Sequence, residues 1–205
     1  MATERTDSYH HGHLRQALLD AAMGLVRERG VEGLTLREVA RRAGVSHNAP
    51  YHHFADKGAL VSALAVDGFR RFEEALRAGL EGIGGSRIAR IRAIGAAYVR
   101  FAFDDPARFT LMWRPELRSV GDDSEVDQAG LSSYQVLIDE IVAGQGAGEI
   151  REGDPGLLAL SSWSLVHGLA ILIVDGPLRD QVTAWSMVEP LLNPVLDMAE
   201  RGLVA

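Results

Sequence analysis

Cysteine is absent from the 205-residue sequence, which excludes disulfide bonds and thiolate metal sites. Basic residues are not in surplus either, since 21 Lys and Arg face 28 Asp and Glu and leave a net charge of −7. This balance argues against a protein that binds any polyanion without selectivity. Residues 1–13 are polar throughout, so we expect no signal peptide there. A cytoplasmic location is the resulting expectation.

Internal repeats and low-complexity tracts are also absent, and no segment shows a credible strand pattern, whereas apolar residues recur at helical spacing. We therefore predict an all-α protein, and a hydrophobic content of 47% is enough for a packed core. Helices are predicted over residues 14–30, 36–43, 46–54, 57–81, 86–104, 106–113, 126–143 and 155–175, with a last helix beyond residue 177. A polar loop is expected over residues 115–125. Pro190 and Pro194 predict a kink or a restart in the last helix.

Charge is unevenly distributed along the chain. Residues 1–60 hold eight Arg and Lys against seven Asp and Glu, and six of the seven histidines. The remaining 145 residues hold 13 basic against 21 acidic residues. The acidic bulk is therefore separated in sequence from a near-neutral N-terminal part that is rich in hydrogen-bonding side chains.

Residues 35–58 predict two short helices around a tight turn, the geometry that places a helix in the major groove of DNA. Thr35 and Glu38 have the spacing of a capping box, and Gly44 supplies the left-handed conformation that ends a helix. Ser46 is then expected to cap the second helix, whose first turn presents His47 and Asn48. So many polar and aromatic side chains on a short helix favour a surface that reads a groove over a core.

The segment from Val45 to Phe54, followed by Asp56, Lys57 and Leu60, resembles the signature of the TetR family of bacterial transcription regulators, and the run from Leu14 to Gly30 is similar to that family's first helix. The resemblance covers residues 11–72. It implies a three-helix helix-turn-helix DNA-binding domain over residues 11–72 and a helical domain for effector binding and dimerisation over residues 73–205.

A second resemblance links Trp163, His167 and Gly168 to a subgroup of this family whose C-terminal domain carries Trp-x-x-x-His-Gly. The subgroup often has Tyr-His-His-Gly near its start, as residues 9–12 have here. Both resemblances imply a dimeric regulator, most simply a repressor, that a small molecule releases from its operator.

The resemblance implies double-stranded DNA with a palindromic operator as partner. The hydroxyls at helix N-termini, the tyrosine and the lysine would contact phosphate, while His47 and Asn48 would reach base edges. Asn48 and Pro50 depart from the commoner glycine and leucine, so detailed groove contacts cannot be copied from relatives. The predicted DNA-binding residues are Thr35, Arg37, Ser46, His47, Asn48, Tyr51, His52, His53 and Lys57.

Aromatic and thioether side chains gather on the helices after residue 60 and suit a hydrophobic guest. The predicted ligand-binding residues are Phe72, Tyr98, Phe101, Phe109, Met112, Trp113, Trp163 and His167. Trp163 and His167 are four residues apart and share a helix face, but plain core packing of His167 stays equally open. The expected effector is small, apolar or aromatic, with one hydrogen-bonding group and no multiple charge.

Residues 156–174 form an apolar run of about the length that spans a bilayer. Three serines and His167 interrupt it and no basic anchor flanks it, so we expect a central helix buried by protein and no membrane partner. The family resemblance implies a homodimer through the last two helices. The residues expected at that interface are Ala159, Leu160, Leu165, Leu169, Leu172, Val188, Leu192, Val195 and Leu196.

Other chemistries are less well supported. Residues 144–148 resemble a phosphate loop only superficially, because no strand precedes them. His10, His11 and His13 lack carboxylate or cysteine partners for a metal, and are read as a mobile arm that can touch DNA. Neither a cofactor, a metal nor a catalytic residue is predicted. The alternatives are an activator or nucleoid-type protein without ligand control, and a helical enzyme.

Overall fold

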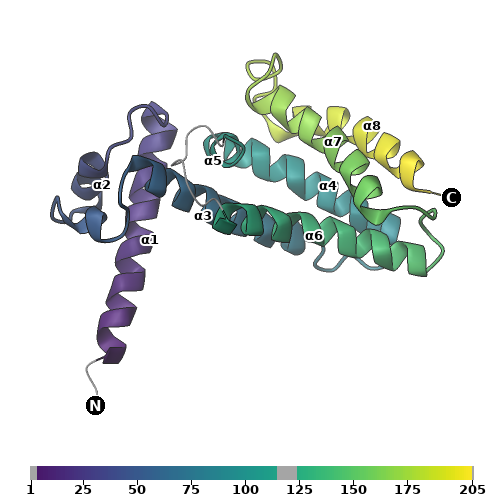
Figure 1. Ribbon diagram of the computed structural model, residues 1–205. Coiled ribbons are helices and arrows are strands. Elements are labelled where there is room, and N and C mark those ends of the chain that lie inside the picture. The colour runs from purple at the N-terminus through teal and green to yellow at the C-terminus, as the bar shows by residue number, and fades with distance from the viewer. Residues whose placement is uncertain (1–3, 115–123, 205) are drawn as a thin grey trace.

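The computed structural model describes residues 4–114 and 124–204, with side chains from His13 onward, and every regular element in those residues is a helix. The all-α prediction is therefore confirmed. Figure 1 shows a small N-terminal headpiece joined to a larger helical body. The elements are α1 (Glu4–Arg29), α2 (Leu36–Ala43), the 3-10 helix η1 (Ala49–His52), α3 (Lys57–Ala78), α4 (Arg87–Asp104), α5 (Pro106–Met112), α6 (Ser124–Gly146), α7 (Pro155–Val174) and α8 (Trp185–Leu203).

Five helices begin where the sequence places a capping side chain. In each, an oxygen of that side chain accepts a backbone N–H from the first helical turn, which no residue within the helix can accept. The capping residues are Thr35, Asp56, Ser86, Asp105 and Asp154. Local hydrogen bonding therefore fixes the starts of α2, α3, α4, α5 and α7.

The first and last helices differ most from the prediction. The first helix begins at Glu4 rather than near Leu14, so the expected histidine arm is part of α1. No proline precedes Pro50, and Gly12 alone costs a helix only about 1 kcal/mol. The last helix runs through Pro190 and Pro194 without a restart. Both prolines are exposed, so water can satisfy the carbonyls that they leave without a donor.

The headpiece consists of α1, α2, η1 and the first turns of α3, packed around one apolar core. Its buried members include Leu18, Leu25, Leu34, Val39, Phe54, Leu60 and Leu64. From there α3 continues without a break past residue 72 into the larger body (Figure 1). One rigid helix therefore belongs to both parts of the molecule.

The larger body packs α3, α4, α6, α7 and α8 side by side, with α5 next to α3. Among the described helices, α7 alone is long and apolar enough to cross a membrane, but it packs against α4, α6 and α8. Close packing of α4 depends on Gly95, where an added Cβ would lie 2.6 Å from Leu196. The predicted loop over residues 115–125 lies mostly outside the described residues, and α6 begins at Ser124.

Candidate functional site

The first helix of the helix-turn-helix is built largely as its sequence predicts. The Thr35 hydroxyl accepts the Glu38 backbone N–H at 3.2 Å, and Gly44 ends the helix with a φ of 69°. The Glu38 carboxylate does not complete the capping box in the described hydrogen bonds. It instead accepts from the Arg41 guanidinium at 2.8 Å.

The second helix is shorter than predicted and starts later. Ser46 is not its cap: η1 begins at Ala49, after Asn48, and His47 and Asn48 form a turn before it. Pro50 explains the difference, because it has no N–H to donate to the Ser46 carbonyl. That carbonyl accepts the Ala49 N–H at 3.0 Å instead, which gives the tighter 3-10 pattern.

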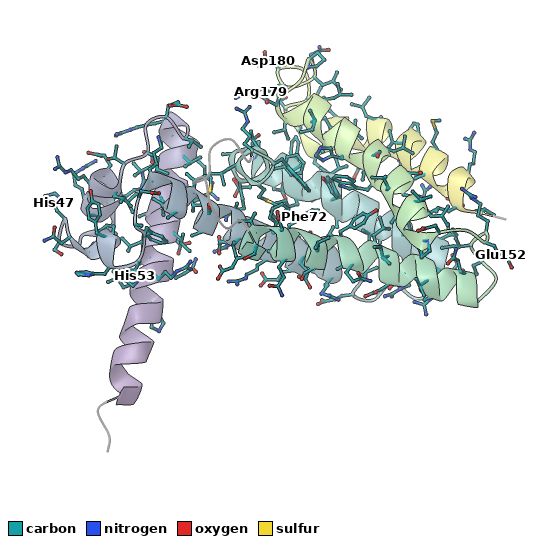
Figure 2. The ribbon with its side chains drawn as sticks, in the orientation of Figure 1. His47, His53, Phe72, Glu152, Arg179 and Asp180 are labelled. Carbon is teal, nitrogen blue, oxygen red and sulfur yellow. The ribbon has the colours of Figure 1, made fainter. Side chains whose placement is uncertain are left out.

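Most of the predicted DNA-binding side chains lie on the surface of the headpiece. Thr35, Arg37, Ser46, His47, Asn48, Tyr51 and His52 are exposed. His53 and Lys57 are half-buried, and the Lys57 ammonium donates to the Glu32 carbonyl at 3.3 Å. In Figure 2, His47 lies at the edge of the headpiece that faces away from the larger body.

The three arginines of α2 differ in how free they are to meet an anion. Arg41 is paired with Glu38, and Arg42 donates to Glu28 at 2.6 Å. Arg37 forms no ion pair with any residue that the structure describes. It is therefore the cation on this helix that is available to a phosphate.

A cavity of about 380 Å³ lies inside the larger body. Its walls come from α3, α4, α6, α7 and α8 together with Trp113, just after α5. Leu131 and Leu160 line it and are themselves exposed, so the cavity reaches the surface between α6 and α7. Most of the wall is apolar: Phe72, Leu76, Ile88, Ile91, Ile94, Tyr98, Trp113, Tyr134, Leu137, Trp163, Val166, Leu196 and Leu203.

Four of the eight predicted ligand-binding residues line this cavity, namely Phe72, Tyr98, Trp113 and Trp163. The other four do not. Phe109 and Met112 are fully buried in the core, and Phe101 borders a separate shallow groove beside Trp185. His167 lies behind the wall, where its Nδ1 is 2.7 Å from the Tyr98 hydroxyl.

Tyr98, Trp163 and His167 form one hydrogen-bonded group at the cavity wall. The Trp163 indole N–H donates to the Tyr98 hydroxyl at 3.2 Å, while that hydroxyl faces His167. Burial raises the pKa of the Tyr98 phenol and lowers the pKa of the His167 imidazole. Both side chains are therefore held neutral, and the Tyr98 hydroxyl, which accepts from Trp163, donates its own hydrogen bond to Nδ1 of the neutral His167.

The sequence pattern did not indicate the contribution of α6 and α8 to the cavity. Leu131, Tyr134 and Leu137 line it from α6, and Leu203 from α8. The spacing of three between the α6 residues does place them on one helix face. That face alone does not tell a cavity wall from a packed core.

Charged groups meet the cavity where α4 faces α8. Arg92 lines it and donates to Asp197 at 2.7 Å and to Glu200 at 3.0 Å. Two carboxylates therefore surround one guanidinium, and Arg92 offers no net positive charge to a guest.

An apolar stripe remains uncovered on the outer surface of α7 and α8. Leu160, Leu165 and Leu172 are exposed, as predicted for an interface, and so are Met187, Leu191 and Met198. Five other predicted interface residues are buried inside the chain and cannot reach a partner: Ala159, Leu169, Val188, Leu192 and Leu196. Val195 is half-buried.

Two family models match this chain. Residues 18–64 match the model described as bacterial regulatory proteins, tetR family. Residues 91–193 match the model described as tetracyclin repressor-like, C-terminal domain. The first match covers the headpiece and the second covers most of the cavity wall.

Individual relatives agree with these models. The class D tetracycline repressor protein of Escherichia coli is 42% identical over 53 residues, 26% of this chain and 24% of that protein. The HTH-type transcriptional regulator BetI of Cronobacter sakazakii is 36% identical over 92 residues, 44% of each chain. The matches thus span between about a quarter and a half of the length of these relatives.

Solved structures match over nearly the whole chain. A protein of unknown function from Rhodococcus sp. RHA1 is 37% identical, with a TM-score of 0.82 over 96% of this chain and 98% of that chain. A putative tetR family transcription regulator from Shewanella sp. PV-4 has a TM-score of 0.70 at 21% identity, over 94% and 98% of the two chains. The latter likeness concerns the fold alone.

Proposed function

Because this chain belongs to the TetR family of bacterial transcription regulators, we propose that it is a cytoplasmic repressor. It binds a palindromic operator as a homodimer and represses transcription there. A small apolar effector that enters the cavity releases it from the operator. The observation that carries the proposal is the apolar cavity beside Tyr98, Trp113 and Trp163. It lies in the same chain as an exposed helix-turn-helix surface, to which α3 connects it. Figure 2 illustrates the separation: His47 and Phe72 lie in different parts of the molecule.

On the DNA side, the domain over residues 11–72 would dock η1 and the turn before it in a major groove. His47 and Asn48 would read base edges there, and Asn is suited to a bidentate contact with adenine. Arg37, Tyr51, His52 and the N-terminus of α2 at Thr35 would hold phosphates. Ser46, His53 and Lys57 complete the proposed contact surface.

The stripe of exposed leucine and methionine on α7 and α8 supports a homodimer through these helices. No charged residue interrupts the line from Met187 through Leu191 and Pro194 to Met198. A second copy that covers both helices would bury this apolar area and fix the distance between two headpieces. The effector then acts by changing that distance, since its free energy shifts the equilibrium only by its differential affinity for the two states.

The domain over residues 73–205 would hold the effector. Membership of the Trp-x-x-x-His-Gly subgroup is part of this proposal, and Trp163 at the cavity with His167 behind it supports that assignment. An activator or a DNA binder without ligand control is the alternative function. A helical enzyme finds less support, because the related proteins are transcription regulators.

Selection of binding sites from random duplex DNA, followed by footprinting with the full chain, tests the proposal. The expected site is two-fold symmetric, with half-sites separated by one helical turn of about 34–36 Å or a multiple of it. A cavity ligand should then abolish the footprint. A footprint that no ligand alters would favour the alternative regulator, and the absence of any footprint would contradict both and favour the enzyme.

A further inference from the structure

We propose that the cavity accepts an elongated, uncharged molecule with a hydrogen-bond acceptor at one end, and that the indole N–H of Trp113 is the donor for that acceptor. This inference rests on the proposed function only in treating the cavity as the effector site. It commits to a chemical class, namely an apolar chain or row of rings that carries a ketone, ester or amide carbonyl.

The lining residues define an elongated shape. On α4 they run from Ile88 to Tyr98, and on α7 from Gly156 to Val166. Ten residues of α-helix rise about 15 Å, so two helices line the cavity over that length. A volume of about 380 Å³ spread along about 15 Å of helix describes a long and narrow space. Such a cavity fits a chain or a narrow ring system better than a compact guest.

The hydrogen-bond acceptor on the guest is inferred from one buried donor that has no partner in the structure. The indole nitrogen of Trp113 is buried and has no hydrogen-bond partner, and among the described residues no other buried side-chain N or O atom shares this condition. A buried N–H without an acceptor is unfavourable. Trp113 lines the cavity, and the proposal requires its ring to turn so that the buried N–H meets a guest oxygen.

The other polar groups of the wall are already occupied. Trp163 donates to Tyr98, and Tyr98 is bonded to His167. The Tyr134 hydroxyl donates to the Gly156 carbonyl at 3.1 Å. Ser133 and Ser162 donate to carbonyls of their own helices. Among the described residues of the wall, Trp113 therefore carries the one unmet donor, and the remaining polar groups, Arg92 included, are paired.

Charge selects against anionic guests. Asp197 and Glu200 pair with Arg92, so among the described residues of the cavity wall a carboxylate or phosphate meets no free cation. An alkylammonium guest could contact the faces of Trp113 and Trp163. It has no lone pair for the orphaned N–H, however, and would leave that donor unsatisfied. A neutral carbonyl compound meets both conditions.

Four probes of matched chain length test the class: 2-decanone, 1-decene, decanoate and decyltrimethylammonium. The chain has three tryptophans, so three indole N–H signals are expected in a proton–nitrogen NMR spectrum of the full protein. We expect 2-decanone to bind about tenfold more tightly than 1-decene, the difference of one buried hydrogen bond. Its binding should shift the Trp113 indole proton downfield.

Trp113→Phe keeps an aromatic ring and removes the donor, so it should lose the preference for 2-decanone over 1-decene, because the ketone carbonyl is then buried without a partner. Trp185→Phe is the matched control, because Trp185 borders the separate groove, and it should keep the preference for the ketone. Tighter binding of decanoate or of the ammonium, an unshifted Trp113 signal in the parent protein, or no binding of any probe would overturn the proposal.

Operator binding separates this inference from the proposed function. If 2-decanone binds as expected but leaves the operator complex intact, the cavity chemistry stands and effector control fails. If only a charged compound releases the operator, effector control stands and the class assigned here is wrong.

Discussion

The Arg108 guanidinium lies 2.6 Å from the Asp67 carboxylate, and this buried ion pair ties α5 to α3. Arg108 also donates to Asp105 at 2.9 Å, and Asp105 accepts in turn from Arg27 of α1. Burial of Asp105 opposes its charge, but hydrogen bonds from Arg27 and Arg108 outweigh this and lower its pKa. An ionic network therefore joins the headpiece to the helix that ends beside the cavity at Trp113.

Arg108→Met should destabilise the protein, because it removes the central cation of this network and leaves two carboxylates partly buried. Asp67 and Asp105 keep Arg71 and Arg27, respectively, so we expect a loss of about 2–3 kcal/mol, at or below the low end for a broken buried pair. Urea unfolding measures it. Arg77→Met is the matched control, since its exposed pair with Glu73 on α3 should be worth less than about 1 kcal/mol. An equal loss of unfolding free energy in both variants would show that the network does not stabilise the fold.

Asn48→Ala should relax sequence preference while leaving the fold intact. Asn48 is exposed in the turn before η1 and makes no side-chain cap, so its amide is free to contact a base. The expected cost is about 1–3 kcal/mol at one base position of each half-site and little at the others. Binding measured against a panel of single-base operator variants decides it. If Asn48→Ala bound every operator variant with the same relative affinity as the parent protein, Asn48 would not contact a base.

Arg37→Ala should weaken binding to all duplexes alike, because Arg37 is the α2 arginine without a described ion pair. Loss of one phosphate contact also reduces the slope of log affinity against log salt by about 1. Arg41→Ala is the control, because the Arg41 guanidinium is held by Glu38 and should matter less. Lys57→Ala is expected to resemble Arg37→Ala more weakly, since Lys57 also holds the Glu32 carbonyl. Sequence-selective loss in Arg37→Ala would contradict a phosphate role.

Capping residues explain why the helical framework was predictable from the sequence. Thr35, Asp56 and Ser86 each stand before an amphipathic run, and one local hydrogen bond decides where the helix starts. Predictions from proline were less reliable. Pro50 shortened the second helix of the headpiece, where the Ser46 carbonyl accepts from Ala49 instead, whereas Pro190 and Pro194 did not interrupt α8.

The cavity was only half predictable, because helical spacing identifies an apolar face but not how much of it a neighbour fills. Phe109 and Phe72 have similar patterns in sequence, yet Phe109 is core and Phe72 lines the cavity. The sequence could not show that the Trp113 indole N–H has no acceptor, because that depends on how the whole structure packs. The helix-turn-helix residues are adjacent in sequence, so the surface that they share could be predicted without knowing how distant segments pack.

Leu165→Glu should dissociate the proposed dimer. Leu165 is exposed on α7 in the single chain, and an interface there would bury two uncompensated carboxylates, one from each copy. Sedimentation measures the mass of each species. Val142→Glu is the control, since Val142 is also exposed but lies on α6, and it should stay dimeric. A dimeric Leu165→Glu protein would move the interface away from this stripe.

Acidification should lower stability in two stages, and two residues identify them. Burial lowers the pKa of His167 below its ordinary 6.5. Between the two pKa values, His167 is therefore protonated in the unfolded chain and neutral in the folded protein. Stability is therefore full above about pH 6.5 and falls as pH drops toward the folded pKa of His167. This stage should be missing in His167→Gln.

The second stage comes from carboxylates with lowered pKa values. Glu140 is one of them, since its pKa is lowered below 4.5, chiefly by the hydrogen bonds from Arg90 and also by that from Arg87. A depressed carboxylate pKa stabilises the folded state above the unfolded pKa, and this stability is lost as pH falls through the folded pKa. Urea midpoints from pH 8 to pH 3 should therefore decline below about 6.5 and more steeply below about 4.5. Glu140→Gln should be less stable at pH 7 and should lose part of the lower stage, while the upper stage remains. A parent protein equally stable at pH 7 and pH 5 would show that the neutral His167 contributes nothing measurable.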